Sequence, residues 1–378
     1  MRRAAAVLSI LWAGSVFAAD SPAGLFGVAY EAGSTARVPQ LSASEALPPR
    51  LEDLLPRPEV ALPAPPPAPE NAAHAVADYE NLWDRIRDGF TIPQIESPAV
   101  DRWQAWYLAR PQILKGILDR SRRYLFHVAE EVSKRGLPME LALLPIVESG
   151  YNPVAESAAQ ASGLWQFIPS TARDYNLPSG PDYDARRDVV ASTDAALDYL
   201  RALHDQFGDW HLALAAYNWG EKSVAKAIER NAAKGLAAGY LALPLPEETR
   251  NYVPKLQALK NLIAEPAAYG LQLDPIANRP YFTIVRSDRA LDAAVAARLA
   301  GVSPEELFSL NPGQIRPVVS GYAPAGLLVL PMDQAEGFIA NLEVYRDAST
   351  AARATTRTRS PGSAPAKMGP RKARVVVQ

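Results

Sequence analysis

The chain has 378 residues, with 39 lysines and arginines against 41 acidic residues and no cysteine. This near-neutral balance excludes nucleic acid as the main partner, and the length is enough for two ordinary domains. The absence of cysteine excludes disulfides, thiolate metal sites and lipid attachment through an N-terminal cysteine.

The first 19 residues have the pattern of a cleaved signal peptide. Arg2 and Arg3 form a basic start, residues 4–17 are apolar, and Val16-Phe17-Ala18 resembles a cleavage site. A membrane anchor is the alternative, but the apolar stretch is shorter than the ~20 residues needed to cross a bilayer. We therefore expect export to the periplasm or cell envelope.

Residues 20–75 are predicted to be a linker. The segment is rich in proline and contains "LPAPPPAP", which favours an extended chain over a packed core.

Residues 76–270 are predicted to form one helical domain. Apolar residues recur at helical spacing, and no convincing strand pattern occurs between 79 and 265. The expected helices lie within 80–90, 104–136 (interrupted at Pro111), 137–149 (kinked at Pro145), 192–208 and 209–220.

The composition changes after Pro275. Residues 281–286 and 326–331 have strand patterns and enclose two helical patterns, which predicts a small β-α-α-β module over 278–345. From Arg346 to the end there are eight basic residues against one acid, so 346–378 is expected to be a disordered basic tail. The fold class is therefore mainly α, with a small α+β module.

Glu148 is the first candidate for chemistry. It ends a run of apolar residues, 143–147, at the end of a predicted helix. The negative end of the helix dipole and the apolar surroundings both favour a carboxyl group that keeps its proton, as a general acid must. The alternative is a surface glutamate at a helix end.

Five motifs give this carboxylate a context. In chain order they are "LLPIVESGYNP", "ASGLWQFIPSTARDYNL", "YDARRDVVAS", "ALAAYNWG" and "LPEETRNYVPKL". Together they resemble the lytic murein transglycosylases, and the D-type group most of all, over residues 80 to 265. The resemblance implies a lysozyme-like helical domain with a groove for a glycan strand.

The resemblance also implies roles for particular residues. Glu148 would be the only catalytic carboxylate, and Ser157 and Gln166 would line the groove around the reacting sugar. Tyr217 would hydrogen-bond the acid, and Glu248 would face the substrate. The alternatives are that Tyr217 belongs to the core and that Gln166 only caps a turn.

The implied reaction cleaves the β-1,4 bond between N-acetylmuramic acid and N-acetylglucosamine in peptidoglycan, with 1,6-anhydromuramic acid ends as products. It needs no metal and no cofactor, and its partner is the glycan strand itself. The C-terminal module resembles a LysM domain, a glycan-binding unit. Two other functions stay open: a muramidase that hydrolyses the same bond, and a non-catalytic peptidoglycan-binding scaffold. Most glycosidases use two carboxyl groups, so the lack of a second obvious acid near the motifs favours the anhydro route.

Overall fold

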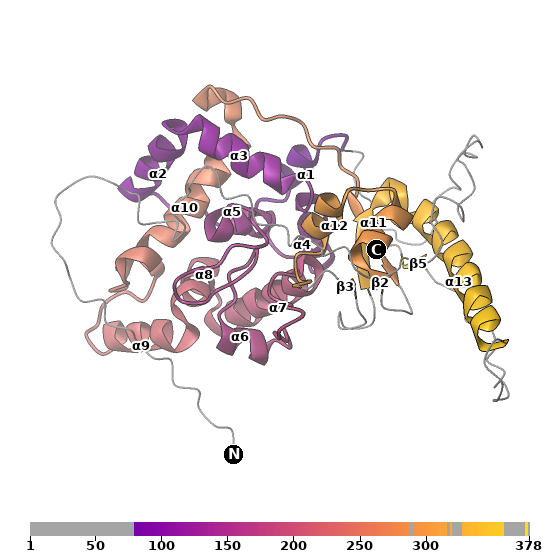
Figure 1. Ribbon diagram of the computed structural model, residues 1–378. Coiled ribbons are helices and arrows are strands. Elements are labelled where there is room, and N and C mark those ends of the chain that lie inside the picture. Colours follow the sequence, from indigo (N-terminus) through magenta and orange to yellow (C-terminus); the bar gives the residue numbers. More distant parts are fainter. Residues whose placement is uncertain (1–78, 287–290, 316–317, 320–326, 359–374, 377–378) are drawn as a thin grey trace, which may run out of the picture.

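The computed structural model describes residues 79–286, 291–315, 318–319, 327–358 and 375–376 (Figure 1). The predicted signal peptide and linker, 1–19 and 20–75, lie outside these residues. Within the described part of the chain, no helix combines the length and apolar character that crossing a membrane requires.

The N-terminal domain is helical, as predicted. From residue 79 to 270, extended pairing occurs only as isolated bridges. Its α-helices are α1 (Leu82–Asp88), α2 (Pro98–Leu108), α3 (Pro111–Ser121), α4 (Leu125–Lys134), α5 (Leu144–Ser149), α6 (Pro169–Asp174), α7 (Val189–Phe207), α8 (Trp210–Trp219), α9 (Glu221–Ala232) and α10 (Glu247–Ala264). Three 3₁₀ helices accompany them, η2 (Met139–Leu143), η3 (Tyr240–Ala242) and η4 (Pro266–Tyr269).

The segment before Glu148 differs from the predicted kinked helix. Residues 139–143 form η2, and Pro145 lies in the first turn of a separate helix, α5. A proline is well tolerated there, because the first-turn N–H groups have no partner within the helix. The proline therefore lies in the first turn of the helix that carries Glu148, not at a kink within it.

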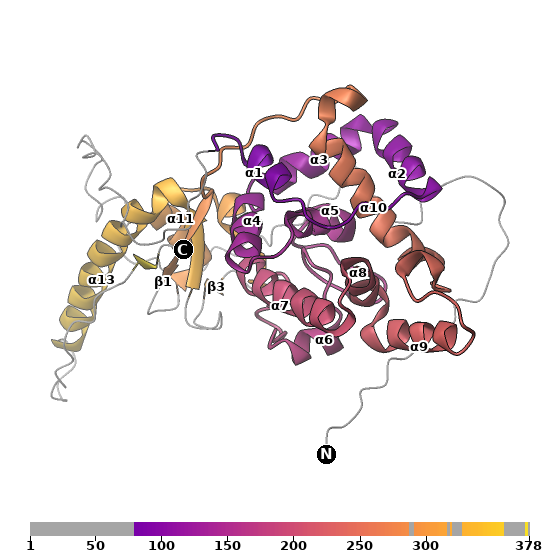
Figure 2. The same ribbon diagram turned by 180° about the vertical axis from the view of Figure 1, so that it is seen from behind.

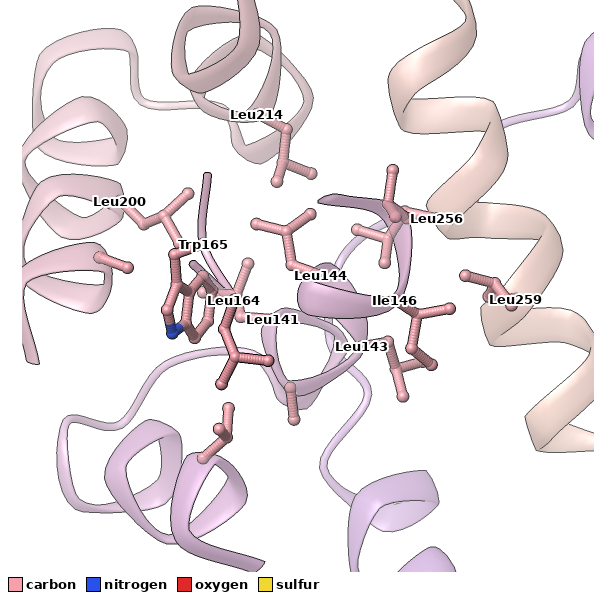
Figure 3. Close-up of a cluster of buried hydrophobic side chains, with 14 of the residues drawn as sticks. Leu141, Leu143, Leu144, Ile146, Leu164, Trp165, Leu200, Leu214, Leu256 and Leu259 are labelled. Atoms are coloured by element: carbon pink, nitrogen blue, oxygen red, sulfur yellow. The ribbon is translucent and has the colours of Figure 1, made fainter. Parts of the chain in front are cut away.

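The core surrounds α5. Both views place α5 within the helical domain, beside α8 and α10 (Figures 1 and 2). Side chains from η2 and α5 meet those of α7, α8 and α10 in one apolar cluster (Figure 3). The labelled members are buried: Leu141, Leu143, Leu144, Ile146, Leu164, Trp165, Leu200, Leu214, Leu256 and Leu259. Since each buried large apolar side chain contributes roughly 1.5–3 kcal/mol, the cluster fixes α5 and the position of Glu148.

The C-terminal module has the predicted β-α-α-β order. Strand β1 (Phe282–Arg286) pairs antiparallel with β4 (Leu327–Pro331). Between them lie α11 (Ala293–Ala300) and α12 (Pro304–Leu310). The short strands β2 (Leu291–Asp292) and β3 (Val318–Val319) form a second antiparallel pair.

The predicted disorder of 346–378 is wrong for part of the segment. After η5 (Met332–Gln334), helix α13 runs from Ala335 to Thr358, and β5 (Val375–Val376) pairs with β1. Residues 346–358 contain four alanines and no proline. Alanine has the highest helix propensity, which outweighs the basic charge that suggested disorder. Residues 359–374 and 377–378 lie outside the described part.

The module packs on the helical domain beside α4 (Figures 1 and 2). Arg123 pairs with Glu306 at 3.0 Å, and the Tyr124 hydroxyl donates to the Ser309 carbonyl. A β-bridge joins Tyr183 to Gln314, with the Asp184 N–H donating to the Gly313 carbonyl at 2.8 Å. The module is thus attached to the 182–188 loop, and that loop packs behind the candidate active site.

Candidate active site

Glu148 occupies the last turn of α5. Gly150 ends the helix at φ +59°, and its N–H bonds back to the carbonyls of Pro145 and Ile146. The Ser149 hydroxyl donates to the Leu164 carbonyl at 2.9 Å, which ties this helix end to the next loop. Glu148 is therefore held between a buried apolar helix and a fixed loop.

Helix α10 presents three polar side chains on one face. Glu248, Tyr252 and Lys255 are spaced by four and three residues, which places them on the same side of a helix. The Tyr252 hydroxyl donates a short hydrogen bond to Oε1 of Glu148. Tyr252 and Lys255 are both buried, at 3 % and 8 % exposure.

This environment changes the acidity of Glu148. Burial raises its pKa to about 7, while the Tyr252 hydrogen bond and the Lys255 charge act in the opposite direction. The charge of Glu248 adds a smaller upward effect on the same pKa. A carboxyl group with this pKa can both release and accept a proton near neutral pH.

The expected role of Tyr217 needs a correction. Its hydroxyl donates to the Trp165 carbonyl at 2.9 Å, and Tyr252 is the tyrosine that bonds Glu148. Burial first and then the nearby Glu148 charge raise the pKa of Tyr217, so its hydroxyl stays neutral beside the acid. Tyr252 lies within the motif "LPEETRNYVPKL", one helical turn after Glu248. That spacing is the signal that could have identified it.

Ser157 and Gln166 lie in one loop beside α5. Ser157 Oγ accepts from the Ala161 N–H at 3.1 Å. Gln166 has φ +50°, and its side-chain amide donates to the carbonyls of Gly163 and Ala155 at 2.9 and 3.3 Å. Both side chains thus close the loop, so Gln166 has the turn-forming role named above as the alternative. These contacts leave a role toward a sugar as a proposal.

The loop is supported from behind by the segment 182–188. Gly163 has φ +89°, and a Cβ atom there would lie 1.8 Å from the Arg186 carbonyl oxygen, so only glycine fits. The Arg186 guanidinium pairs with Asp184 at 2.7 Å and donates to the Gln160 carbonyl at 2.6 Å. These contacts hold the loop against the segment 182–188.

Glu248 lies in the first turn of α10 and is exposed. Its carboxylate accepts from the Asn218 side chain at 3.4 Å, and Asn218 in turn accepts from the Thr249 hydroxyl at 2.7 Å. Glu248 is thus near enough for its charge to raise the pKa of Glu148, and it lies on the solvent side of the site.

The described residues contain no group of three or more His, Asp and Glu side chains that could hold a metal ion. The site supplies one carboxyl group placed for proton transfer, Glu148, beside the polar face of α10.

Comparisons with known proteins bear on both parts of the chain. The Transglycosylase SLT domain family matches residues 127–238, and the family "Lytic transglycosylase MltD, LysM-like domain" matches 281–346. These two matches cover the whole of α5 with Glu148 and the β-α-α-β module. They confirm the resemblance that the motifs indicated.

Individual relatives are similar to parts of the chain. The chain is 41% identical over 240 residues to "Membrane-bound lytic murein transglycosylase D" of Escherichia coli strain K12, covering 63% of this chain and 53% of the relative. It is 48% identical over 110 residues to "Putative tributyltin chloride resistance protein" of Alteromonas sp. strain M-1, covering 29% of this chain and 53% of the relative. The chain thus spans about half the length of these relatives.

Among solved structures, the 70 kDa soluble lytic transglycosylase of Escherichia coli matches with a TM-score of 0.32 and 20% identity. That match covers 48% of this chain and 33% of the other.

Proposed function

We propose that this lytic murein transglycosylase D-like chain, which joins an SLT domain to a LysM-like domain, cleaves peptidoglycan glycan strands. The bond is the β-1,4 link from N-acetylmuramic acid to N-acetylglucosamine, and the product ends are 1,6-anhydromuramic acid. The observation that carries the proposal is Glu148, a carboxyl group whose pKa burial raises to about 7 and which accepts a hydrogen bond from Tyr252.

In the first step Glu148 acts as the general acid. It transfers its proton to the oxygen that links the two sugars, and the C1–O bond of the muramic acid breaks. The acetamido group of that sugar assists at C1. Tyr252 keeps donating to Glu148 as it becomes a carboxylate, and a hydrogen bond to a charged acceptor is stronger than one to a neutral acceptor.

In the second step the same residue acts as the base. The Glu148 carboxylate accepts the proton of the sugar's C6 hydroxyl, and the C6 oxygen forms a bond to C1 as the bond between C1 and the assisting acetamido oxygen breaks. Glu148 regains its proton, and no water is consumed. The hydrogen-bonded loop of Ser157 and Gln166 would border the reacting sugar, and Glu248 would face the strand from the exposed edge.

The spatial relation of Glu248 to Glu148 favours one alternative, a muramidase. Most glycosidases pair an acid with a second carboxylate, and Glu248 is a carboxylate whose charge reaches Glu148. If Glu248 activated water, the products would be hydrolysed ends. A non-catalytic peptidoglycan-binding scaffold is the third possibility.

The test is product analysis of the parent and Glu148→Gln proteins on purified peptidoglycan. The amide has nearly the shape of the acid but cannot donate the proton, so we expect anhydro products from the parent and none from the variant. Circular dichroism checks that the variant is folded. A folded Glu148→Gln protein that releases products at the parent's rate would remove Glu148 from the mechanism.

The location and domain division extend the same proposal. We assign residues 1–19 to a cleaved signal peptide, 20–75 to a linker, 76–270 to the catalytic domain and 278–345 to the LysM-like module. The chain would then act at the cell envelope or periplasm, where peptidoglycan lies. Fusing residues 1–19 to a periplasmic reporter tests this, since export of the reporter requires a working signal.

A further inference from the structure

Lys255 is a buried cation next to the proposed active site. Its residue exposure is 8 %, although lysine is among the residues least often buried without a partner. It follows Tyr252 by three residues on α10, so it lies on the helix face that carries the hydrogen bond to Glu148.

Trp103 of α2 holds the ammonium group. Lys255 Nζ lies 4.7 Å from the centroid of the Trp103 ring, within the range of a cation–π interaction. The Trp103 ring is itself fixed, because its Nε1 donates to Asn251 Oδ1 at 3.1 Å. Such a contact stabilises the charged form of a lysine that burial would otherwise disfavour.

The titratable groups around Glu148 come from two helices. On α10 they are Lys255 and Glu248 together with the Tyr252 hydroxyl, and on α8 the Tyr217 hydroxyl is nearby. Lys255 is the cation of this set, and Glu148 and Glu248 are the two carboxylates that act on it. Burial lowers the pKa of Lys255, and both carboxylates raise it.

The proposed reaction makes Glu148 alternate between a neutral and a charged form. When Glu148 is protonated, Lys255 and Glu248 balance each other. Once Glu148 has given up its proton, the site holds two carboxylates, and their repulsion would oppose the step without a nearby cation.

We propose that Lys255, held by Trp103, is a positioning residue that stabilises the ionised form of Glu148 created by bond cleavage, and so sets the pH range of the reaction. The proposal rests on the proposed function for its catalytic consequence. The electrostatic coupling itself can be measured without activity.

The test compares Lys255→Met with Lys255→Arg in the full chain. Methionine keeps an unbranched apolar stem without the charge, and arginine keeps the charge. Selective ¹³C labelling of glutamate carboxyl groups, with Glu148→Gln to identify the signal, gives the titration midpoint of Glu148 by NMR. The pH profile of product release from peptidoglycan is the second readout.

We expect the Glu148 midpoint to rise by about one pH unit in Lys255→Met, because an opposite charge has been removed, and to return towards the parent value in Lys255→Arg. The basic limb of the pH profile should move with it. Lys260→Met is the matched control. Lys260 lies on the same helix over the Phe90 ring but pairs with Glu140, so its removal should lower Tm without moving the midpoint.

An unchanged midpoint in folded Lys255→Met would overturn the proposal and leave Lys255 a structural residue. The proposal would also be overturned if the midpoint were unchanged and Lys255→Met lost affinity for peptide-bearing strands but not for bare glycan. Lys255 would then be a binding residue for an anionic group of the substrate. A shifted midpoint in Lys255→Met, combined with a parent protein that makes no anhydro product, would support the coupling but refute the proposed function.

Discussion

Replacing Tyr252 by phenylalanine tests the most specific contact of the site. The change removes the hydroxyl that donates to Glu148 Oε1 and keeps the buried ring, so the packing of α10 is preserved. Because the hydrogen bond lowers the pKa of Glu148 against the effect of burial, its loss should raise that pKa above about 7.

The size of the shift follows from the strength of the bond. A hydrogen bond to a charged group contributes about 1.5–3 kcal/mol, and one pKa unit corresponds to about 1.4 kcal/mol. Tyr252→Phe should therefore raise the pKa of Glu148 by about one to two units. The rate of cleavage near neutral pH should fall about 10- to 100-fold, because the carboxylate formed during cleavage loses the same stabilisation.

The assay is the pH dependence of kcat/KM for release of muropeptides. Since protonated Glu148 is the active form, its higher pKa moves the basic limb of the profile to higher pH. Tyr217→Phe is the matched control, because its hydroxyl bonds the Trp165 carbonyl and its loss should leave the limb in place. A basic limb that moves in Tyr217→Phe and stays fixed in Tyr252→Phe would refute the assignment of Tyr252.

Three further changes test other parts of the structure. Glu148→Gln should be more stable than the parent by up to about 3 kcal/mol at pH 8 and equal to it at pH 4. The pKa of Glu148 is about 7 in the folded state against an ordinary 4.5, so the parent loses stability as pH rises through that window. Equal Tm differences between the two proteins at both pH values would contradict this. Gly163→Ala should destabilise the protein by about 3 kcal/mol or more, since φ is +89° and the new Cβ would lie 1.8 Å from the Arg186 carbonyl oxygen. Gly180→Ala is the control: its new Cβ would have no atom within 4 Å, so its free energy of unfolding in denaturant titrations should be near that of the parent. Gly313→Ala should lower the free energy of unfolding by about 1–3 kcal/mol, because its Cβ would lie 2.9 Å from the Tyr183 ring. Gly337→Ala is the control within the module, since its Cβ would have no atom within 4 Å. Equal Tm values of the helical domain in the two variants would show that the module does not support the 182–188 loop.

Sequence patterns predicted the parts of the molecule that local physics determines. Helical spacing of apolar residues located the helices that contain Glu148 and Tyr217. The alternation of strand and helix patterns after Pro275 gave the β-α-α-β module. The apolar run before Glu148 predicted its raised pKa, because the residues that desolvate it include its own neighbours in the chain.

The features that were missed depend on contacts between distant residues. Tyr252 is 104 residues from Glu148, and only the packing of α10 on α5 brings them together. Trp103 and Lys255 meet in the same way, across α2 and α10. Pro145 was placed in the wrong part of a helix because the preceding residues form a 3₁₀ turn, whose apolar pattern resembles that of an α-helix.

The origin of the nucleophile is the most direct test of the central claim. Peptidoglycan would be digested by the parent protein in water enriched in heavy oxygen, and the new ends would be weighed by mass spectrometry. Attack by the C6 hydroxyl predicts anhydro ends that weigh one water less than hydrolysed ends and carry no label. One heavy oxygen at every cut would contradict the transglycosylase mechanism and identify a muramidase.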